Sequence, residues 1–340
     1  MGGGMIPRSM VGHGISADLA HRFAPSLVAP DALERQIAVD QANVSVVVGE
    51  AVVVTWLRRP VPAPHRAVTL MEHLAEVGFV ETPPLLGAHH VDGNVTAILT
   101  GYLPESLDGW DWYVDFLTSE LDDGGGVRSV GIAARLGSLA ARLHLALATP
   151  TRVLPLPVGW ASAAAEHARA VALCDAALAM TEGEAGARLR ARAARIRAAI
   201  DTLVTVGEVD VQHIHGDLHV GQVLRSRGAL FLTDFDGNPV TAGSPMRSTM
   251  VDLASLVQSV DHVGRVVAKR RPDLSDGVES FLVDALPTLI TAYGKAAPVH
   301  DGLLAALRTV QELHEYVYAA RQLPHWGYVA DAAMCALHPE

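Results

Sequence analysis

The sequence predicts an α+β fold with two lobes: a small sheet-bearing N-terminal lobe, residues 1–103, and a mainly helical C-terminal lobe, residues 104–340. In the first lobe, β-branched runs lie on both sides of Gly49-Glu50, which is a strong hairpin signal. In the second lobe, residues 161–200 are rich in Ala, Arg and Glu, a composition typical of helices. A chain of 340 residues is also long enough to build two lobes.

The elements of the N-terminal lobe follow from local patterns. Residues 44–48 and 51–56 are expected to pair as a hairpin, because β-branched residues dominate both runs. Residues 65–77 repeat apolar residues at helical spacing, and residues 95–103 have the composition of a further strand. The expected order is therefore hairpin, helix, strand.

Two long segments of the C-terminal lobe have helical spacing. Residues 129–148 alternate small and long apolar residues, and residues 161–200 are expected to form two helices with a break near residues 183–186. Ala-rich helices of this kind usually serve as scaffold, so we assign them no chemistry.

The segment that carries chemistry is residues 212–239, QHIHGDLHVGQVLRSRGALFLTDFDGNP. Asp217 ends a His-Gly-Asp, Gln222 follows it by five residues, and Asp234 opens an Asp-Phe-Asp-Gly. This spacing suits phosphoryl transfer. A carboxylate must accept or orient the proton of the attacking hydroxyl, while an amide oxygen and a second carboxylate hold Mg²⁺ against the nucleotide phosphates.

The same segment predicts how these groups come together. Residues 222–225 and 229–233 are expected to form strands around a turn at 226–228. Such a hairpin would carry Asp217 at its entry and Asp234 at its exit. The alternative is a polar surface loop in which the motif is incidental, and that requires several matches in the right order by chance.

These residues resemble the motifs of the aminoglycoside-phosphotransferase-like kinases, and within them the maltokinase-like branch. Gln222, where aminoglycoside kinases usually have Asn, favours the maltokinase side. Asp236, where maltokinases usually have Glu, and the shorter chain are more similar to the actinobacterial glucosamine kinases. The matching motifs read His215-Gly216-Asp217-Leu218-His219-Val220-Gly221-Gln222 and Asp234-Phe235-Asp236-Gly237-Asn238-Pro239.

The resemblance implies a protein-kinase-like fold and an ATP-dependent sugar kinase that converts D-glucosamine to glucosamine 6-phosphate with Mg²⁺-ATP. Asp217 would be the catalytic base, and Gln222 and Asp234 would hold Mg²⁺. His219 and Asp236 would lie near the transferring group or the sugar. Alternatives are a maltokinase or an aminoglycoside phosphotransferase, or, from another class, an inactive kinase-fold binding protein.

The resemblance also locates the nucleotide. Tyr102 and Leu103 would form the hinge whose backbone receives the adenine. Thr55 stands where the family offers a phosphate-binding Lys. We therefore expect Arg58 or Arg59 to supply the charge, although both could equally be solvated residues at a strand end.

Three residues near the C-terminus are candidates for the acceptor sugar. Glu312 or Glu315 could face a cleft and meet a cationic amine, and Trp326 could stack on a sugar ring. The alternative is an amphipathic helix with solvated acids. Asp252, in contrast, is expected to support the catalytic loop through hydrogen bonds, as the resemblance implies. The aromatic residues of segment 108–113 could line a sugar site, although core packing is their commoner use.

Composition excludes several function classes. Lys and Arg number 26 against 37 Asp and Glu, a net charge of −11, so a nucleic-acid partner is not expected. No apolar run of membrane-spanning length and no signal peptide is expected. Two cysteines without metal-binding spacing suit a reducing cytoplasm. The expected partners are an amino sugar and ATP, and the oligomeric state is not predicted.

Overall fold

The computed structural model describes residues 12–37, 43–238 and 246–339. Pro239, the last residue of the motif, lies outside the described residues. The chain divides into two compact units. The first comprises Met1–Leu107, Thr151–Pro155 and Val223–Asp236; the second comprises Asp108–Pro150, Leu156–Gln222 and Gly237–Glu340. The predicted cut between residues 103 and 104 stays a prediction.

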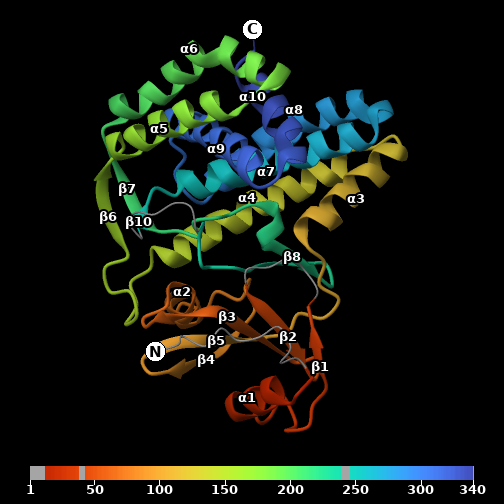
Figure 1. The fold of residues 1–340 in the computed structure, drawn as a ribbon, viewed down its shortest axis with the longest axis vertical. Coiled ribbons are helices and arrows are strands. Elements are labelled where there is room, and N and C mark those ends of the chain that lie inside the picture. Colours follow the sequence, from red (N-terminus) through yellow and green to blue (C-terminus); the bar gives the residue numbers. More distant parts are fainter. Residues whose placement is uncertain (1–11, 38–42, 239–245, 340) are drawn as a thin grey trace. The chain divides into compact units, whose positions relative to one another are not determined.

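The first unit is built on a five-stranded antiparallel sheet in the order β1-β2-β3-β5-β4. Figure 1 shows α1 and α2 on opposite sides of this sheet. Apolar residues of α1 pack against strands β2, β3 and β5 and form its core. The elements are α1 (Ile15–Phe23), β1 (Glu34–Gln36), β2 (Val44–Val48), β3 (Val52–Pro62), α2 (Arg66–Glu76), β4 (Leu85–Val91) and β5 (Asn94–Gly101).

The hairpin predicted at Gly49-Glu50 is present. Gly49 and Glu50 have φ values of 57° and 49°, and the Ala51 amide donates to the Val48 carbonyl at 3.1 Å. Two central residues with positive φ match the right-handed twist of the paired strands. The predicted helix and the following strand are also present, as α2 and β5.

A second hairpin, β8 (Val223–Ser226) and β9 (Ala229–Leu232), also belongs to the first unit. The Leu232 amide donates to the Glu81 carbonyl at 2.8 Å, and the Ser226 hydroxyl donates to the Pro104 carbonyl at 2.6 Å. The predicted turn at 226–228 is confirmed, because Ser226 pairs with Ala229 and both Arg227 and Gly228 have positive φ. Gln222 ends a short 3₁₀ helix instead of opening the strand.

The second unit is mainly helical, with one small antiparallel sheet in the order β10-β7-β6. Helix α7 is buried along most of its length and is central to this unit. The helices are α3 (Gly109–Asp122), α4 (Val127–Leu147), α5 (Ala164–Met180), α6 (Gly183–Val206), α7 (Met250–Arg270), α8 (Ser275–Gly294), α9 (Asp301–Arg321) and α10 (Gly327–Leu337). The strands are β6 (Val158–Ser162), β7 (Glu208–His213) and β10 (Met246–Arg247), and the 3₁₀ helices are η2 (Val220–Gln222), η3 (Pro272–Leu274) and η4 (Pro324–Trp326).

Helices α4 and α8 cross closely at Gly137. A Cβ atom on Gly137 would lie 2.1 Å from the Leu289 carbonyl oxygen, so no other residue fits this crossing without a shift.

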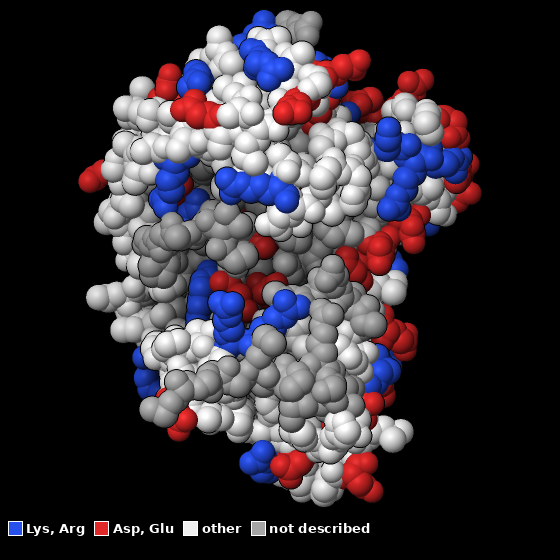
Figure 2. Space-filling view, in the orientation of Figure 1, with Lys and Arg blue, Asp and Glu red and all other residues white. Residues whose placement is uncertain are grey.

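By length and composition α4 could span a membrane, which corrects the expectation that no such run exists. Its packing is that of a core helix, since 56% of its most apolar window is buried. On the face drawn in Figure 2, acidic and basic side chains are interspersed.

Candidate active site

The catalytic loop, residues 214–219, is fixed to the start of α7 through its backbone. Asp252 accepts hydrogen bonds from the amides of His215 at 2.7 Å and Gly216 at 2.8 Å. Gly216 has a φ of 84°, a conformation that costs glycine little. The Ser259 hydroxyl oxygen accepts from the Val220 amide at 3.0 Å just beyond the loop. The predicted role of Asp252 as a support for the loop is confirmed.

Asp252 itself belongs to a buried chain of polar groups. His144 Nε2 lies 3.0 Å from Asp252 Oδ2, and His144 Nδ1 lies 2.8 Å from the Tyr293 hydroxyl. Burial alone would raise the pKa of Asp252, but the hydrogen bond and charge of His144 and the Gly216 amide together lower it below its usual value. The loop is thus held by a carboxylate that stays ionised.

Asp217 projects from this loop with 26% of its side chain exposed. Asn238 donates its side-chain amide to Asp217 Oδ1 at 3.2 Å and its backbone amide to the Gly216 carbonyl at 3.2 Å. His219 Nε2 lies 3.9 Å from Asp217 Oδ2. An oriented, accessible carboxylate can accept a proton from a bound hydroxyl. Asn238 stands in the motif, but the spacing assigned it no role.

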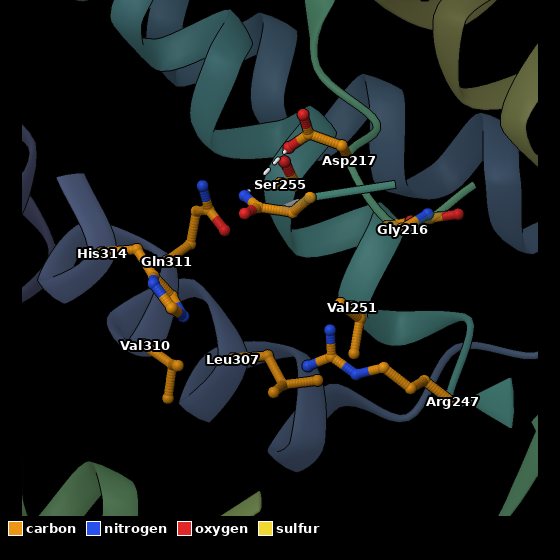
Figure 3. Close-up of a pocket in the computed structure, with 11 residues that line it drawn as sticks. Gly216, Asp217, Arg247, Val251, Ser255, Leu307, Val310, Gln311 and His314 are labelled. Atoms are coloured by element: carbon orange, nitrogen blue, oxygen red, sulfur yellow. Dashed lines mark hydrogen bonds between the residues drawn. The ribbon is translucent and has the colours of Figure 1, made fainter. Parts of the chain in front are cut away.

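A pocket of about 450 Å³, including open solvent, lies beside Asp217 in the second unit. Figure 3 shows Gln311 and His314 of α9 reaching it from the side opposite Gly216. Arg247 also lines it and binds both oxygens of Glu166 at 3.2 Å. Burial lowers the pKa of His314, assisted by the positive charge of Arg247. Gln311 and His314 were not predicted as site residues, although their spacing of three puts them on one helix face.

The structure brings Glu315 and Trp326 together, while their contacts with the sugar stay predictions. The Trp326 indole donates to Glu315 Oε2 at 3.1 Å, and the Gln311 amide donates to Glu315 Oε1 at 3.2 Å. Trp110 lies edge-on to Trp326, with ring centroids 5.6 Å apart, and its ring centroid is 6.3 Å from that of His219. Trp110 thereby links the catalytic loop to the Glu315 region. Its signal was the aromatic segment 108–113, in which the two other aromatic residues, Trp112 and Tyr113, do pack in the core.

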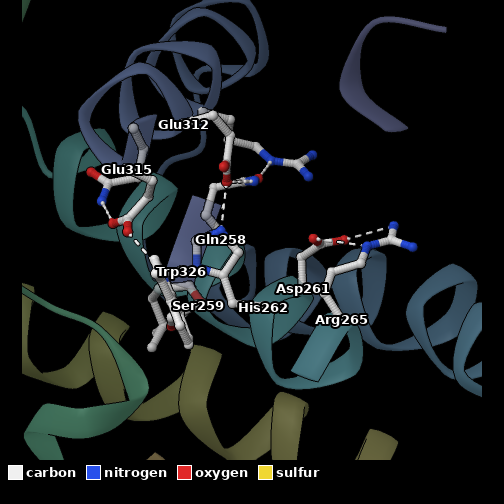
Figure 4. A network of polar contacts seen from close by, with 11 residues as sticks. Gln258, Ser259, Asp261, His262, Arg265, Glu312, Glu315 and Trp326 are labelled. Atoms are coloured by element: carbon white, nitrogen blue, oxygen red, sulfur yellow. Dashed lines mark hydrogen bonds and ion pairs between the residues drawn. The ribbon is translucent and has the colours of Figure 1, made fainter. Parts of the chain in front are cut away.

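Glu312 lies elsewhere. Its side chain has no exposed surface and accepts hydrogen bonds from Gln258 and from His262, the latter at 2.8 Å (Figure 4). Burial raises the pKa of Glu312, and the charge of His262 only partly offsets this. Glu312 and Glu315 are three residues apart on α9, but Glu312 contacts Gln258 and His262 of α7. Glu315 instead contacts Gln311 and Trp326. The sugar contact predicted for Glu312 is therefore not what this arrangement provides.

Asp234 and Asp236 follow β9 in the first unit. Asp234 has a φ of 60°, an uncommon conformation for a residue other than glycine. Burial raises the pKa of Asp236, the positive charge of His65 opposes that rise, and the Asp234 carboxylate adds to it. His65 Nε2 lies 3.6 Å from Asp236 Oδ1, and Arg66 donates to the Phe235 carbonyl.

The residues predicted to meet the nucleotide are also in this unit. The Tyr102 amide donates to the Ala51 carbonyl at 2.9 Å, so it is not the donor that an adenine would use. The prediction that the Tyr102 N–H receives the adenine is therefore wrong. The same role for the backbone of Leu103 stays a prediction. Arg58 is exposed, and its backbone amide donates to the Asn43 side chain at 3.2 Å.

The proposed Mg²⁺ ligands are Gln222, in the second unit, and Asp234, in the first. An amide oxygen and a carboxylate suit Mg²⁺, which takes one or two protein carboxylates and completes its shell with water and phosphate oxygens. Among the residues that the structure describes, no group of three or more His, Cys, Asp or Glu forms a metal cluster. The joint role of Gln222 and Asp234 stays a prediction.

No protein-family model matches the chain. The glucosamine kinase of Streptacidiphilus jiangxiensis is 37% identical over 377 residues, covering 100% of this chain and 84% of that protein. The glucosamine kinase of Mycolicibacterium smegmatis is 35% identical over 324 residues, covering 90% of this chain and 80% of its own length. A solved structure of glucosamine kinase in complex with glucosamine, ADP and inorganic phosphate is 34% identical with a TM-score of 0.84, covering 98% of this chain and 84% of that one. These matches confirm the predicted resemblance and the two-lobed, protein-kinase-like α+β fold.

Proposed function

Because this chain belongs to the glucosamine kinase family, we propose that it transfers the γ-phosphoryl group of ATP to the 6-hydroxyl of D-glucosamine, giving glucosamine 6-phosphate. It is thus a phosphotransferase with an alcohol as acceptor. The observation that carries the proposal is Asp217, an accessible carboxylate on a loop fixed by buried contacts, beside a pocket that α9 lines.

We assign Asp217 the role of the base that accepts the proton of the acceptor hydroxyl. As the hydroxyl attacks, Asp217 orients it and accepts its proton, while Asn238 holds the carboxylate in place. Mg²⁺, held by Gln222 and Asp234, would supply positive charge to the phosphates. Asp234→Ala is expected to weaken Mg²⁺-ATP binding, measured by calorimetry, more than Gln222→Ala does, because a carboxylate contributes more than a neutral amide.

Glu315 is the acid that best suits the substrate ammonium. It is half-buried next to Trp326 and Gln311, and a carboxylate has lone pairs for about four hydrogen bonds, more than the two described. Trp326 and Trp110 offer aromatic surface for the sugar ring. His219 and Asp236 stay predictions as neighbours of the sugar or the transferring group.

The test is a screen of ADP release with glucosamine, glucose, maltose, N-acetylglucosamine and aminoglycosides as acceptors. We expect release with glucosamine and little with maltose or aminoglycosides. Release only with maltose or only with an aminoglycoside would favour those alternatives. A chain that releases no ADP with any acceptor would be an inactive binding protein, and the proposal would fail. A cytoplasmic location stays a prediction.

A further inference from the structure

Strand β3 lacks the lysine that kinase chemistry places there. In protein kinases a Lys on the third strand contacts the phosphates. Thr55 occupies this region, and its hydroxyl lies 3.2 Å from that of Ser45 on the neighbouring strand. Val52 and Val54 pack in the core with α1, so the alternation of a strand puts Thr55 on the opposite face. That is the face on which α2 lies (Figure 1).

The arginines that follow Thr55 lie in an irregular part of the strand. Arg58 and Arg59 come after the point where the β3–β5 register shifts, between Trp56 and Val61. Both side chains are exposed. They therefore occupy an irregular strand end instead of the position that the missing Lys would have.

Arg66, the first residue of α2, does approach the segment that follows β9. Its guanidinium donates to the Phe235 carbonyl and interacts electrostatically with Asp236. The Phe235 ring is buried, which fixes that carbonyl, and the preceding residue, His65, lies 3.6 Å from Asp236. The first turn of α2 is thus joined to the segment that the motif assigns to Mg²⁺ and phosphate.

Helix formation does not account for a cation at this position. A positive charge in the first turn opposes the helix dipole, which favours anions there. The Phe235 carbonyl is a neutral acceptor, and the Arg66 charge also interacts with the Asp236 carboxylate. A triphosphate beside the two carboxylates Asp234 and Asp236 needs positive charge in addition to Mg²⁺, and Arg66 is in the same unit as both.

We infer that Arg66 binds the nucleotide phosphates in place of the lysine that β3 lacks. The inference rests on the proposed function, because it takes ATP as the phosphoryl donor. It replaces the earlier expectation for Arg58 and gives the role to α2. A planar guanidinium held at a loop carbonyl is oriented for anion binding before the nucleotide arrives.

The test measures binding without any sugar. Calorimetric affinities for Mg²⁺-ATP, Mg²⁺-ADP and adenosine would be compared in the wild type and in Arg66→Gln, Arg66→Lys and Arg58→Gln. Arg22→Gln is the matched control, since Arg22 is an exposed arginine on α1 whose carboxylate partner is Asp18. Adenosine lacks phosphate, so its affinity reports whether the unit is still folded.

We expect Arg66→Gln to weaken Mg²⁺-ATP and Mg²⁺-ADP about tenfold to a hundredfold, the range of a charge-assisted contact, and to leave adenosine unchanged. Arg66→Lys should recover most of that loss, and Arg58→Gln and Arg22→Gln should bind as the wild type does. The inference is overturned if Arg66→Gln binds Mg²⁺-ATP normally, if it loses adenosine equally, or if Arg58→Gln causes the larger loss. If the wild-type protein binds Mg²⁺-ATP but releases no ADP with glucosamine, the proposed function is wrong, while the inference about Arg66 is still decided by the binding data.

Discussion

Two buried histidine–carboxylate pairs hold the second unit together, and they differ in what surrounds the carboxylate. His144 and Asp252 join α4 to α7, with 3.0 Å between Nε2 and Oδ2. His262 and Glu312 join α7 to α9, with 2.8 Å between Nε2 and Oε1. All four side chains are almost entirely buried.

The two carboxylates differ in their other donors. Asp252 accepts two backbone amides in addition to His144, and its pKa is lowered in spite of burial. Glu312 accepts Gln258 and His262 on Oε1 alone, and Oε2 has no hydrogen-bond partner among the described residues. Burial therefore raises its pKa, while its charge raises the pKa of His262 to about 9 against the cost of burying that ring.

The comparison shows that a histidine partner alone does not keep the pKa of a buried carboxylate low. Backbone amides supply fixed dipoles, and they make Asp252 a stable anchor for the catalytic loop. Glu312 holds α9 to α7, but burial disfavours its ionised form. Its partner His262 lies edge-on to Trp326, with ring centroids 6.2 Å apart. The first pair thus holds the loop that carries Asp217, and the second holds α9 next to Trp326.

The largest expected effect is at Asp217, the carboxylate that the Asp252 network places. Asp217→Asn keeps the shape and removes the charge, so turnover should fall about 10²-fold or more, the range of general acid–base catalysis. Affinity for ATP should survive, because Asp217 is assigned to the acceptor hydroxyl. Turnover and calorimetric ATP affinity check this, and near-normal turnover would remove Asp217 from the base role.

The next effect tests the comparison directly through stability. Asp252→Asn removes an ionised carboxylate and leaves its three donors poorly matched, which should cost about 3–5 kcal/mol of unfolding free energy. Glu312→Gln should cost less, about 1–3 kcal/mol, because the ionised form of Glu312 is already penalised. Urea denaturation of both variants measures the two losses. A larger loss for Glu312→Gln would reverse the ranking of the two networks.

Local patterns predicted much of the fold and part of the site. The hairpin at Gly49-Glu50 and the helices are local features, which sequence periodicity records. The different environments of Glu312 and Glu315 could not be predicted, since both residues fit the same amphipathic helix. Their separation depends on Gln258 and His262, which lie 54 and 50 residues before Glu312, on α7. The approach of Arg66 to Phe235 is likewise a contact between residues 169 apart in the sequence.

The pH dependence of stability sharpens the second half of the comparison. His262 has a pKa of about 9 in the folded chain against 6.5 for an ordinary histidine. Its stabilising contribution is therefore fully present below pH 6.5 and is lost as pH rises through 9. The loss is at most about 3 kcal/mol, because burying Glu312 opposes the gain. Urea denaturation at both ends of this window, in the wild type and in His262→Gln, measures it. An equal fall in the variant would show that other groups cause it.

The smallest expected effect concerns acceptor choice and separates the two acids of α9. Glu315→Gln should reduce the preference for glucosamine over glucose about tenfold to a hundredfold, because a charge-assisted contact to the ammonium is lost and glucose carries no such charge. Glu312→Gln is the matched control, and its preference should stay that of the wild type since its side chain is buried. Asp236→Asn distinguishes a third case: a metal role would depress kcat/KM for both sugars alike, and an amine role would depress it for glucosamine alone. If Glu312→Gln shifts the preference and Glu315→Gln does not, the acid that meets the sugar is the buried one, and the assignment of the ammonium contact to Glu315 is wrong.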